Sequence, residues 1–160
     1  MSVEVTAPAM LDLFRPVHQR IREDLLGLDA AVLNWRPGPE TNSVGALIEH
    51  IVTTERRNLL RINGLADDRA SSELDAARRI RPHGWVKLLD QADAFLDEMG
   101  QKMPSSRLST LVTHPHRGPS TALVLILQTY GHVKEHFGHF ELTRQLCLQG
   151  FAPTSGTERR

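Results

Sequence analysis

The chain has 160 residues with 19 acidic and 19 basic side chains, so its formal net charge is zero. A neutral chain lacks the electrostatic footprint of a protein that binds nucleic acid or an anionic membrane surface, and we expect neither partner. The length predicts one domain, which we place at residues 1–150, with a hydrophobic core of its own. The single cysteine, Cys147, can form no intrachain disulfide and suits a protein of the reducing cytoplasm.

Four stretches of the chain repeat apolar side chains every three or four residues, which is the period of an amphipathic helix. With no convincing strand between them, they predict an all-α fold, a four-helix bundle with long crossover connections. A further short helix is expected at 72–79, and the small and polar residues of 151–160 predict a disordered tail. The four long predicted helices span residues 8–26, 44–63, 85–99 and 120–149.

Prolines and polar caps indicate where these helices begin. Pro16 lies inside the first stretch, so we expect either a kink there or a helix that begins near Arg15. Ser43 or Asn42 is a suitable N-cap for the second helix, because a short polar side chain can accept a hydrogen bond from the first turn. Residues 82–84, Pro-His-Gly, predict a break before the third helix.

The fourth helix begins with a run of apolar side chains at 122–127. A helix that is apolar on every side is expected to be buried on every side, and the run is too short to span a membrane. Gln128 and Thr129 follow, so this helix becomes polar as it approaches its histidines. This pattern is typical of a pocket at one end of a packed core, and equally of a helix face that emerges into solvent.

Three histidines, His132, His136 and His139, lie late in the fourth helix. Because a helix turns by about 100° per residue, His136 and His139 project at roughly +40° and −20° relative to His132. One helix face therefore carries all three, and an HxxxH pair can present two imidazoles to one metal ion. The alternative is a set of solvated or hydrogen-bonded helix histidines.

A third metal ligand would have to come from another helix, because bundles build metal sites from facing helices. His50, in the middle of the second helix, is the better candidate; His18 lies close to the uncertain boundary at Pro16. His50 could instead be a hydrogen-bonded core histidine, since its helix face is apolar. Three neutral imidazoles suit zinc, nickel, iron or copper better than magnesium or calcium, and they leave a position open for water or substrate.

Three segments together resemble the DinB-like family of four-helix-bundle proteins, over nearly the whole chain. In that family, one histidine on the second helix and an HxxxH pair on the fourth bind metal, and His50, His132 and His136 match these positions one by one. His139 stands where the family more often has glutamine, so we interpret it as a pocket residue and candidate proton carrier. The segments are LNWRP at 33–37, TNSVGALIEH at 41–50, and HVKEHFGH at 132–139 with ELTRQL at 141–146.

The resemblance implies one divalent transition metal (zinc, nickel or iron) and, commonly, a homodimer. Its relatives include mycothiol- or bacillithiol-dependent S-transferases and maleylpyruvate isomerases. We therefore predict a metal-dependent enzyme that acts on a small molecule, such as a low-molecular-weight thiol, by S-transfer, isomerisation or hydrolysis, with His139 as the catalytic residue. The alternatives are a non-catalytic metal-binding stress or accessory protein with the same ligands, and a helical interaction module whose histidines only pack.

Overall fold

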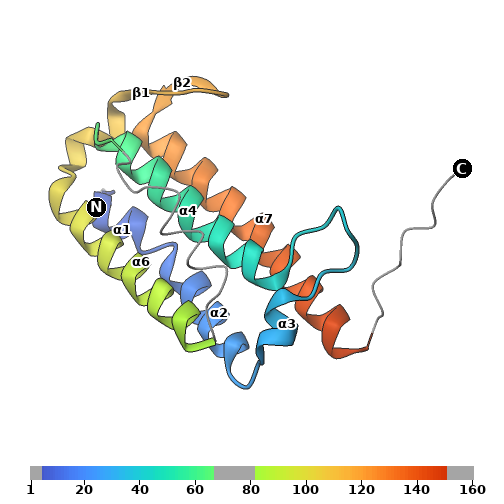
Figure 1. Ribbon diagram of the computed structural model, residues 1–160. Coiled ribbons are helices and arrows are strands. Elements are labelled where there is room, and N and C mark those ends of the chain that lie inside the picture. The colour runs from blue at the N-terminus through green and yellow to red at the C-terminus, as the bar shows by residue number, and fades with distance from the viewer. Residues whose placement is uncertain (1–4, 67–81, 151–160) are drawn as a thin grey trace, which may run out of the picture.

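The computed structural model describes residues 5–66 and 82–150; the predicted helix at 72–79 and the tail at 151–160 lie outside the described residues. Long helices lie side by side as a bundle, which confirms the predicted all-α fold (Figure 1). Helices α4 and α6 run in one direction, and α1, α2 and α7 run in the other. The helices are α1 (Ala7–Leu11), α2 (Arg15–Leu25), α3 (Ala30–Asn34), α4 (Val44–Ile62), α6 (Pro82–Lys102), a 3₁₀ helix (Ser105–Ser109) and α7 (Ala122–Leu148).

Two of the predicted helix starts are confirmed. The first predicted helix is interrupted after Leu11, and α2 begins at Arg15 with Pro16 in its first turn. Proline is tolerated there because the N–H that it lacks would have no partner within the helix. Ser43 caps α4, and its Oγ accepts a hydrogen bond from the Ala46 N–H at 3.2 Å.

The break predicted at residues 82–84 is wrong, because α6 begins at Pro82. Proline pre-sets a helical φ, so it starts a helix as readily as it ends one. The short helix α3 was not predicted either. Its signal is Asp29, whose Oδ1 accepts a hydrogen bond from the Val32 N–H at 2.9 Å and caps the helix start.

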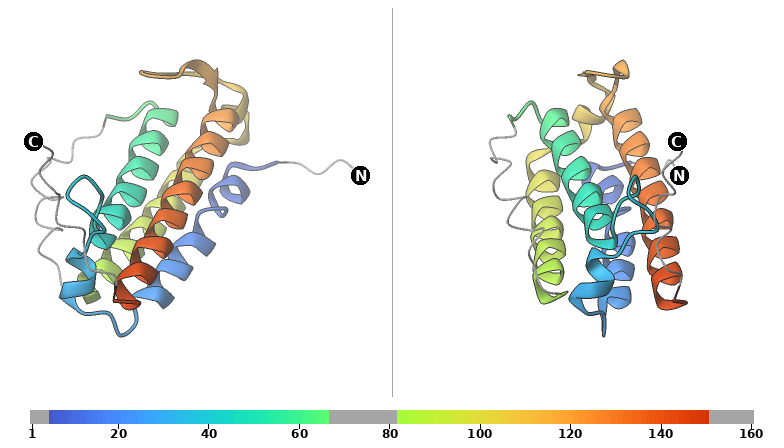
Figure 2. Two further views of the ribbon diagram at one scale, coloured as in Figure 1. Left: turned by 90° about the vertical axis from the view of Figure 1, so that its right-hand side faces the viewer. Right: turned by 45° about the vertical axis from the view of Figure 1, so that its right-hand side comes forward.

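The long connection before α7 contains a short β-hairpin, which the prediction of a helical bundle without a convincing strand did not include. Strand β1 (Leu111–His114) pairs antiparallel with β2 (Gly118–Thr121), and His114 lies opposite Gly118. The turn requires a positive φ of 72° at Gly118, which glycine adopts without strain. The hairpin projects beyond the end of the bundle (Figures 1 and 2).

The hydrophobic core lies between the long helices, and α4 packs against α7 along much of its length (Figure 2). Ile48 and Ile51 on α4 and Leu125 and Phe140 on α7 are fully buried there. This packing brings one face of α4 against the face of α7 that carries the histidines. Among the described helices, none has a stretch long and apolar enough to cross a membrane.

The apolar start of α7 predicted a helix that is buried on every side, and this prediction is wrong. Val124 and Leu127 are 41% and 46% exposed, whereas Leu125 and Ile126 between them are buried. Leu142, further along α7, is 55% exposed. Helix α7 therefore presents an apolar outer face opposite the core, which the composition of the segment could not distinguish from a buried face.

Candidate metal centre

The predicted ligands His50, His132 and His136 lie together where α4 faces α7. One ligand nitrogen from each imidazole can be chosen so that all three lie within 4.8 Å of one another. The Nε2 atoms of His50 and His132 are 2.9 Å apart, and the ring centroids of His50 and His136 are 4.3 Å apart. The spacing along α7 aligns the HxxxH pair, and the packing of α4 on α7 supplies the third imidazole.

The electrostatics of this cluster favour neutral imidazoles. Burial lowers the pKa of His136, and the charges that the neighbouring histidines would carry lower it further. The pKa of His50 is also lowered, mainly by partial burial of its ring and to a smaller extent by the charges of His132 and Arg57. Because a neutral imidazole has a free lone pair and a protonated one has none, both shifts keep these side chains in the form that binds metal.

The residues present fit a transition metal. The Nδ1 atom of His136 is buried and has no hydrogen-bond partner among the described residues, although a buried polar atom normally has one. The Nε2 atoms of His50 and His132 face each other at 2.9 Å, so only one of these two nitrogens can carry a hydrogen. A cation bound by all three nitrogens would satisfy these groups, and three imidazoles suit zinc, nickel or iron. The role of the three histidines as ligands stays a prediction.

A cavity of about 320 Å³ adjoins the cluster at His139. The ring of His139 lies one turn beyond that of His136, with 5.3 Å between the centroids, and its side chain is exposed. The cavity is formed by the loop before α4, the first turn of α4 and the second half of α7. A molecule bound there would contact His139, whereas His50, His132 and His136 do not line the cavity. Its walls comprise Pro37, Glu40, Thr41, Asn42, Leu47, His139, Leu142, Thr143 and Leu146.

The other candidate ligand, His18, belongs to a different site. Its ring is completely buried, with Nδ1 2.7 Å from Asp93 Oδ1 and Nε2 3.0 Å from Glu55 Oε2. Burial alone would lower the pKa of His18, but the hydrogen bonds to Asp93 and Glu55 outweigh it and raise the pKa to about 9. His18 therefore links α2 to α4 and α6 as a buried cation.

Sequence reasoning missed this network, although the sequence contains a signal for it. Glu55 is 1% exposed and lies between Ile51 and Leu59 on the core-facing stripe of α4. His18 likewise lies between Phe14 and Ile21 on the buried face of the first helices. A charged side chain in a core stripe requires a partner of opposite charge, and two such residues on different helices predict that they meet.

Three other side chains of α7, Thr129, Gln128 and Cys147, differ in their surroundings. Thr129 is buried in the core, where its hydroxyl donates to the Leu125 carbonyl and accepts from the Asn58 side chain, so it is not a pocket residue. Gln128 is exposed. Burial raises the pKa of the Cys147 thiol, which disfavours the nucleophilic thiolate.

Comparison with known proteins agrees with this architecture. The sequence profile of the DinB superfamily matches residues 13–140. The fold is similar to the crystal structure of the DinB-like protein YjoA from Bacillus subtilis, with a TM-score of 0.64 over 94% of this chain and 99% of that one. The two sequences are 14% identical, so this likeness speaks for the fold alone. No curated protein matches the chain significantly. Because the matched region covers most of the chain and includes all three clustered histidines, this chain belongs to the DinB superfamily.

Proposed function

We propose that this protein is a metal-dependent enzyme in which His50, His132 and His136 hold one divalent transition metal: zinc, nickel or iron. The observation that carries the proposal is the incomplete ligand set beside a cavity. The cluster contains three imidazoles, and no fourth His, Cys, Asp or Glu of the described residues joins it. Catalytic metal sites keep one position open for water or substrate, whereas structural sites are closed by a fourth side chain.

The chemistry proposed for this site is thiol transfer, isomerisation or hydrolysis of a small molecule. A divalent metal lowers the pKa of a bound thiol or water and so supplies a nucleophile near neutral pH. His50 and His136 would bind the metal as neutral imidazoles, because burial and the neighbouring histidines lower the pKa of both. A low-molecular-weight thiol is the proposed cosubstrate.

The cavity beside the cluster suits a small organic substrate. Leu47 and Leu146 provide apolar walls that can hold the carbon skeleton, and Thr143 and Asn42 provide polar groups that can orient it. His139 lies between this cavity and His136, so its imidazole can take up or release a proton next to the reacting group. These positions support His139 as the proton carrier.

Cobalt substitution tests whether the site accepts a thiol. The bound cobalt should give a visible absorption spectrum, and adding N-acetylcysteine should change that spectrum saturably because an open position admits the sulfur. S-methylcysteine, which cannot form a thiolate, should change it far less. A cobalt-loaded protein whose spectrum does not respond to the thiol would contradict the thiol-dependent enzyme and leave hydrolysis or a non-catalytic metal-binding protein.

We also propose that two copies of the chain pair through the exposed outer face of α7. Its exposed residues form a pattern that is symmetric about a point between residues 134 and 135. In a two-fold antiparallel helix pair, residues at equal distances on either side of the axis meet each other. Leucine would therefore meet leucine, glycine would meet glycine at close approach, and lysine would meet glutamate. The pairs are Leu127 with Leu142, Gly131 with Gly138, and Lys134 with Glu135.

Leu127→Asp should weaken this dimer at least tenfold, a cost of about 1.4 kcal/mol, because it places two carboxylates in an apolar seam. Sedimentation velocity over a range of protein concentrations measures the change. Leu111→Asp is the matched control, since Leu111 is 70% exposed on the hairpin, away from this face. A wild-type protein that remains monomeric, or an equal effect of both substitutions, would exclude the proposed interface.

A further inference from the structure

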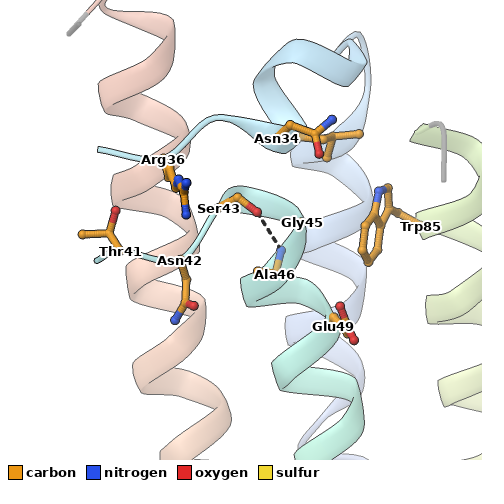
Figure 3. A pocket seen from close by; sticks show the side chains of 10 residues that line it. Asn34, Arg36, Thr41, Asn42, Ser43, Gly45, Ala46, Glu49 and Trp85 are labelled. Atoms are coloured by element: carbon orange, nitrogen blue, oxygen red, sulfur yellow. Dashed lines mark hydrogen bonds between the residues drawn. The ribbon is translucent and has the colours of Figure 1, made fainter. Parts of the chain in front are cut away.

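Leu142 belongs to two surfaces of α7 at once. It lines the cavity of about 320 Å³ beside His139, and it is 55% exposed on the outer face of the helix. The opposite wall is the loop before α4, whose residues Thr41 and Asn42 are exposed and are labelled in Figure 3. Every lining residue belongs to this loop, to the first turn of α4 or to α7. Because both walls reach the surface, the cavity opens to solvent beside the outer face of α7.

Two exposed residues lie on the same side of α7 as the cavity but nearer to the start of the helix. Because a helix turns by about 100° per residue, Val124 lies at roughly +60° and Gln128 at roughly +100° relative to Leu127. By the same geometry, Leu142 lies at roughly +60° and His139 at roughly +120°. Val124 and Gln128 therefore project in nearly the same direction as the cavity wall. Gln128 is roughly 16 Å along the helix axis from His139, too far to line the cavity of its own chain.

Pairing of two chains brings these two residues to the cavity of the other chain. This step rests on the dimer proposed above, in which Leu127 of the partner subunit meets Leu142. Gln128 of the partner subunit then lies level with Glu141, and Val124 of the partner subunit lies one turn further along. The two-fold axis of an antiparallel helix pair is perpendicular to the plane of the two helices, so the cavity side of α7 is the same side in both chains. The partner's Val124 and the partner's Gln128 therefore border the open side of the cavity.

These two side chains suit the position that the dimer gives them. Val124 is 41% exposed, and beside Leu142 and Leu146 it would extend the apolar wall of the cavity. Gln128 makes no hydrogen bond to any described residue, so its amide is free to donate to and accept from a ligand. This neutral amide also tolerates the carboxylate of Glu40 in the opposite wall, which would repel an acidic side chain in the same place.

We propose that the cavity beside His139 is a composite site, closed on its outer side by Val124 of the partner subunit and Gln128 of the partner subunit. Each chain supplies His139 and the loop before α4 to its own cavity, and Val124 and Gln128 to the cavity of the other chain. The dimer thus carries two equivalent cavities. Only the dimer shields a bound small molecule from water on the outer side of the cavity.

Crosslinking between two different chains tests where the partner lies. In a Cys147→Ser background, one chain carries Glu40→Cys on the cavity loop, and the other carries Gln128→Cys and a peptide tag that changes its mass. A short bismaleimide should join the two into a mixed dimer, because the two thiols lie across one cavity. Leu111→Cys on the hairpin, in place of Glu40→Cys, should give no mixed product. A dimer in sedimentation velocity without the crosslink between residues 40 and 128 would overturn the composite cavity and leave the dimer.

Protection of a cavity thiol tests whether the partner closes the site. Leu146→Cys, in the same background, should react with a maleimide roughly tenfold more slowly at protein concentrations where the dimer forms. Adding Leu127→Asp should restore the fast reaction at the same concentration. The control is Ala46→Cys, which lines a larger cavity of about 430 Å³ around Trp85 (Figure 3). The lining residues of that cavity belong to α3, the loop, α4 and α6, so the rate of Ala46→Cys should not change.

Neither measurement involves a metal or a thiol substrate, so the composite cavity can fail while the metal centre stands, and the reverse. Three results would each overturn the proposal. They are a chain that stays monomeric, equal reaction rates of Leu146→Cys at low and high protein concentration, and equal protection of Ala46→Cys.

Discussion

Replacing His136 by alanine is expected to abolish tight metal binding while the protein remains folded. Loss of a group that only supports a metal ligand costs about 10- to 100-fold in affinity, so loss of a ligand should cost more than about 100-fold. Protein purified without an affinity tag should contain nearly one zinc, nickel or iron per chain when wild type and almost none as the variant. Elemental analysis measures this directly, and His132→Ala should behave in the same way.

The matched control is His114→Ala, which removes an imidazole from the hairpin rather than from the cluster. It should retain the metal. The fold is checked by thermal unfolding: excess zinc at about 100 times its Kd should stabilise the wild type and His114→Ala by about 3 kcal/mol and the His136 variant by almost nothing. Equal metal contents in wild type and His136→Ala would reject the site. Loss of metal from the His114→Ala variant would reject the assignment of the metal site to His50, His132 and His136.

The second large effect is expected at the buried network of His18, Glu55 and Asp93. His18→Ala should cost about 3–5 kcal/mol of unfolding free energy near neutral pH, because it leaves the buried carboxylate of Glu55 without its partner. Burial then raises the pKa of Glu55 without opposition from His18. Urea unfolding measures this loss. His116→Ala, at an exposed position, should change the free energy by less than about 0.5 kcal/mol.

The same network predicts that the wild-type protein loses stability as the pH rises from about 6.5 to 9. The pKa of His18 is raised from 6.5 to about 9 in the folded state, so the folded protein holds a proton that the unfolded chain releases. This contribution is complete below pH 6.5 and is lost as the pH passes 9. Its size is about 3 kcal/mol, because each tenfold difference in proton affinity between the folded and unfolded chains corresponds to roughly 1.4 kcal/mol.

Urea unfolding in EDTA at several pH values tests this slope without the contribution of bound metal. The double variant His18→Gln with Glu55→Gln carries no titrating pair and should show a nearly flat profile over the same interval. The lowered pKa values of His50 and His136 act in the opposite direction. The unfolded chain binds these protons more tightly than the folded protein, so this contribution makes stability rise as the pH increases towards 6.5. It is the same in both proteins. Parallel profiles for the two proteins would show that His18 is not protonated in the fold.

Much of the secondary structure and the alignment of two of the three candidate metal ligands were predictable because they depend on neighbours along the chain. The cap at Ser43, the start of α2 at Arg15 and the alignment of His132 with His136 follow from the hydrogen-bond geometry of one helix, which repeats every 3.6 residues. The failures also have local reasons. Pro82 is compatible with both the start and the end of a helix.

Contacts between helices were decided by the tertiary structure. His18 and His50 are both helical histidines in partly apolar stripes, and from the sequence His50 was the better candidate for the third ligand, with His18 as the alternative. Packing of α4 on α7 brings His50 to the HxxxH pair, while packing of α2 against α6 buries His18 beside Asp93 and Glu55. By itself, the sequence determined which side chains share one helix face. Which faces meet depends on the combined packing of many side chains on separate helices, and no local spacing encodes that result.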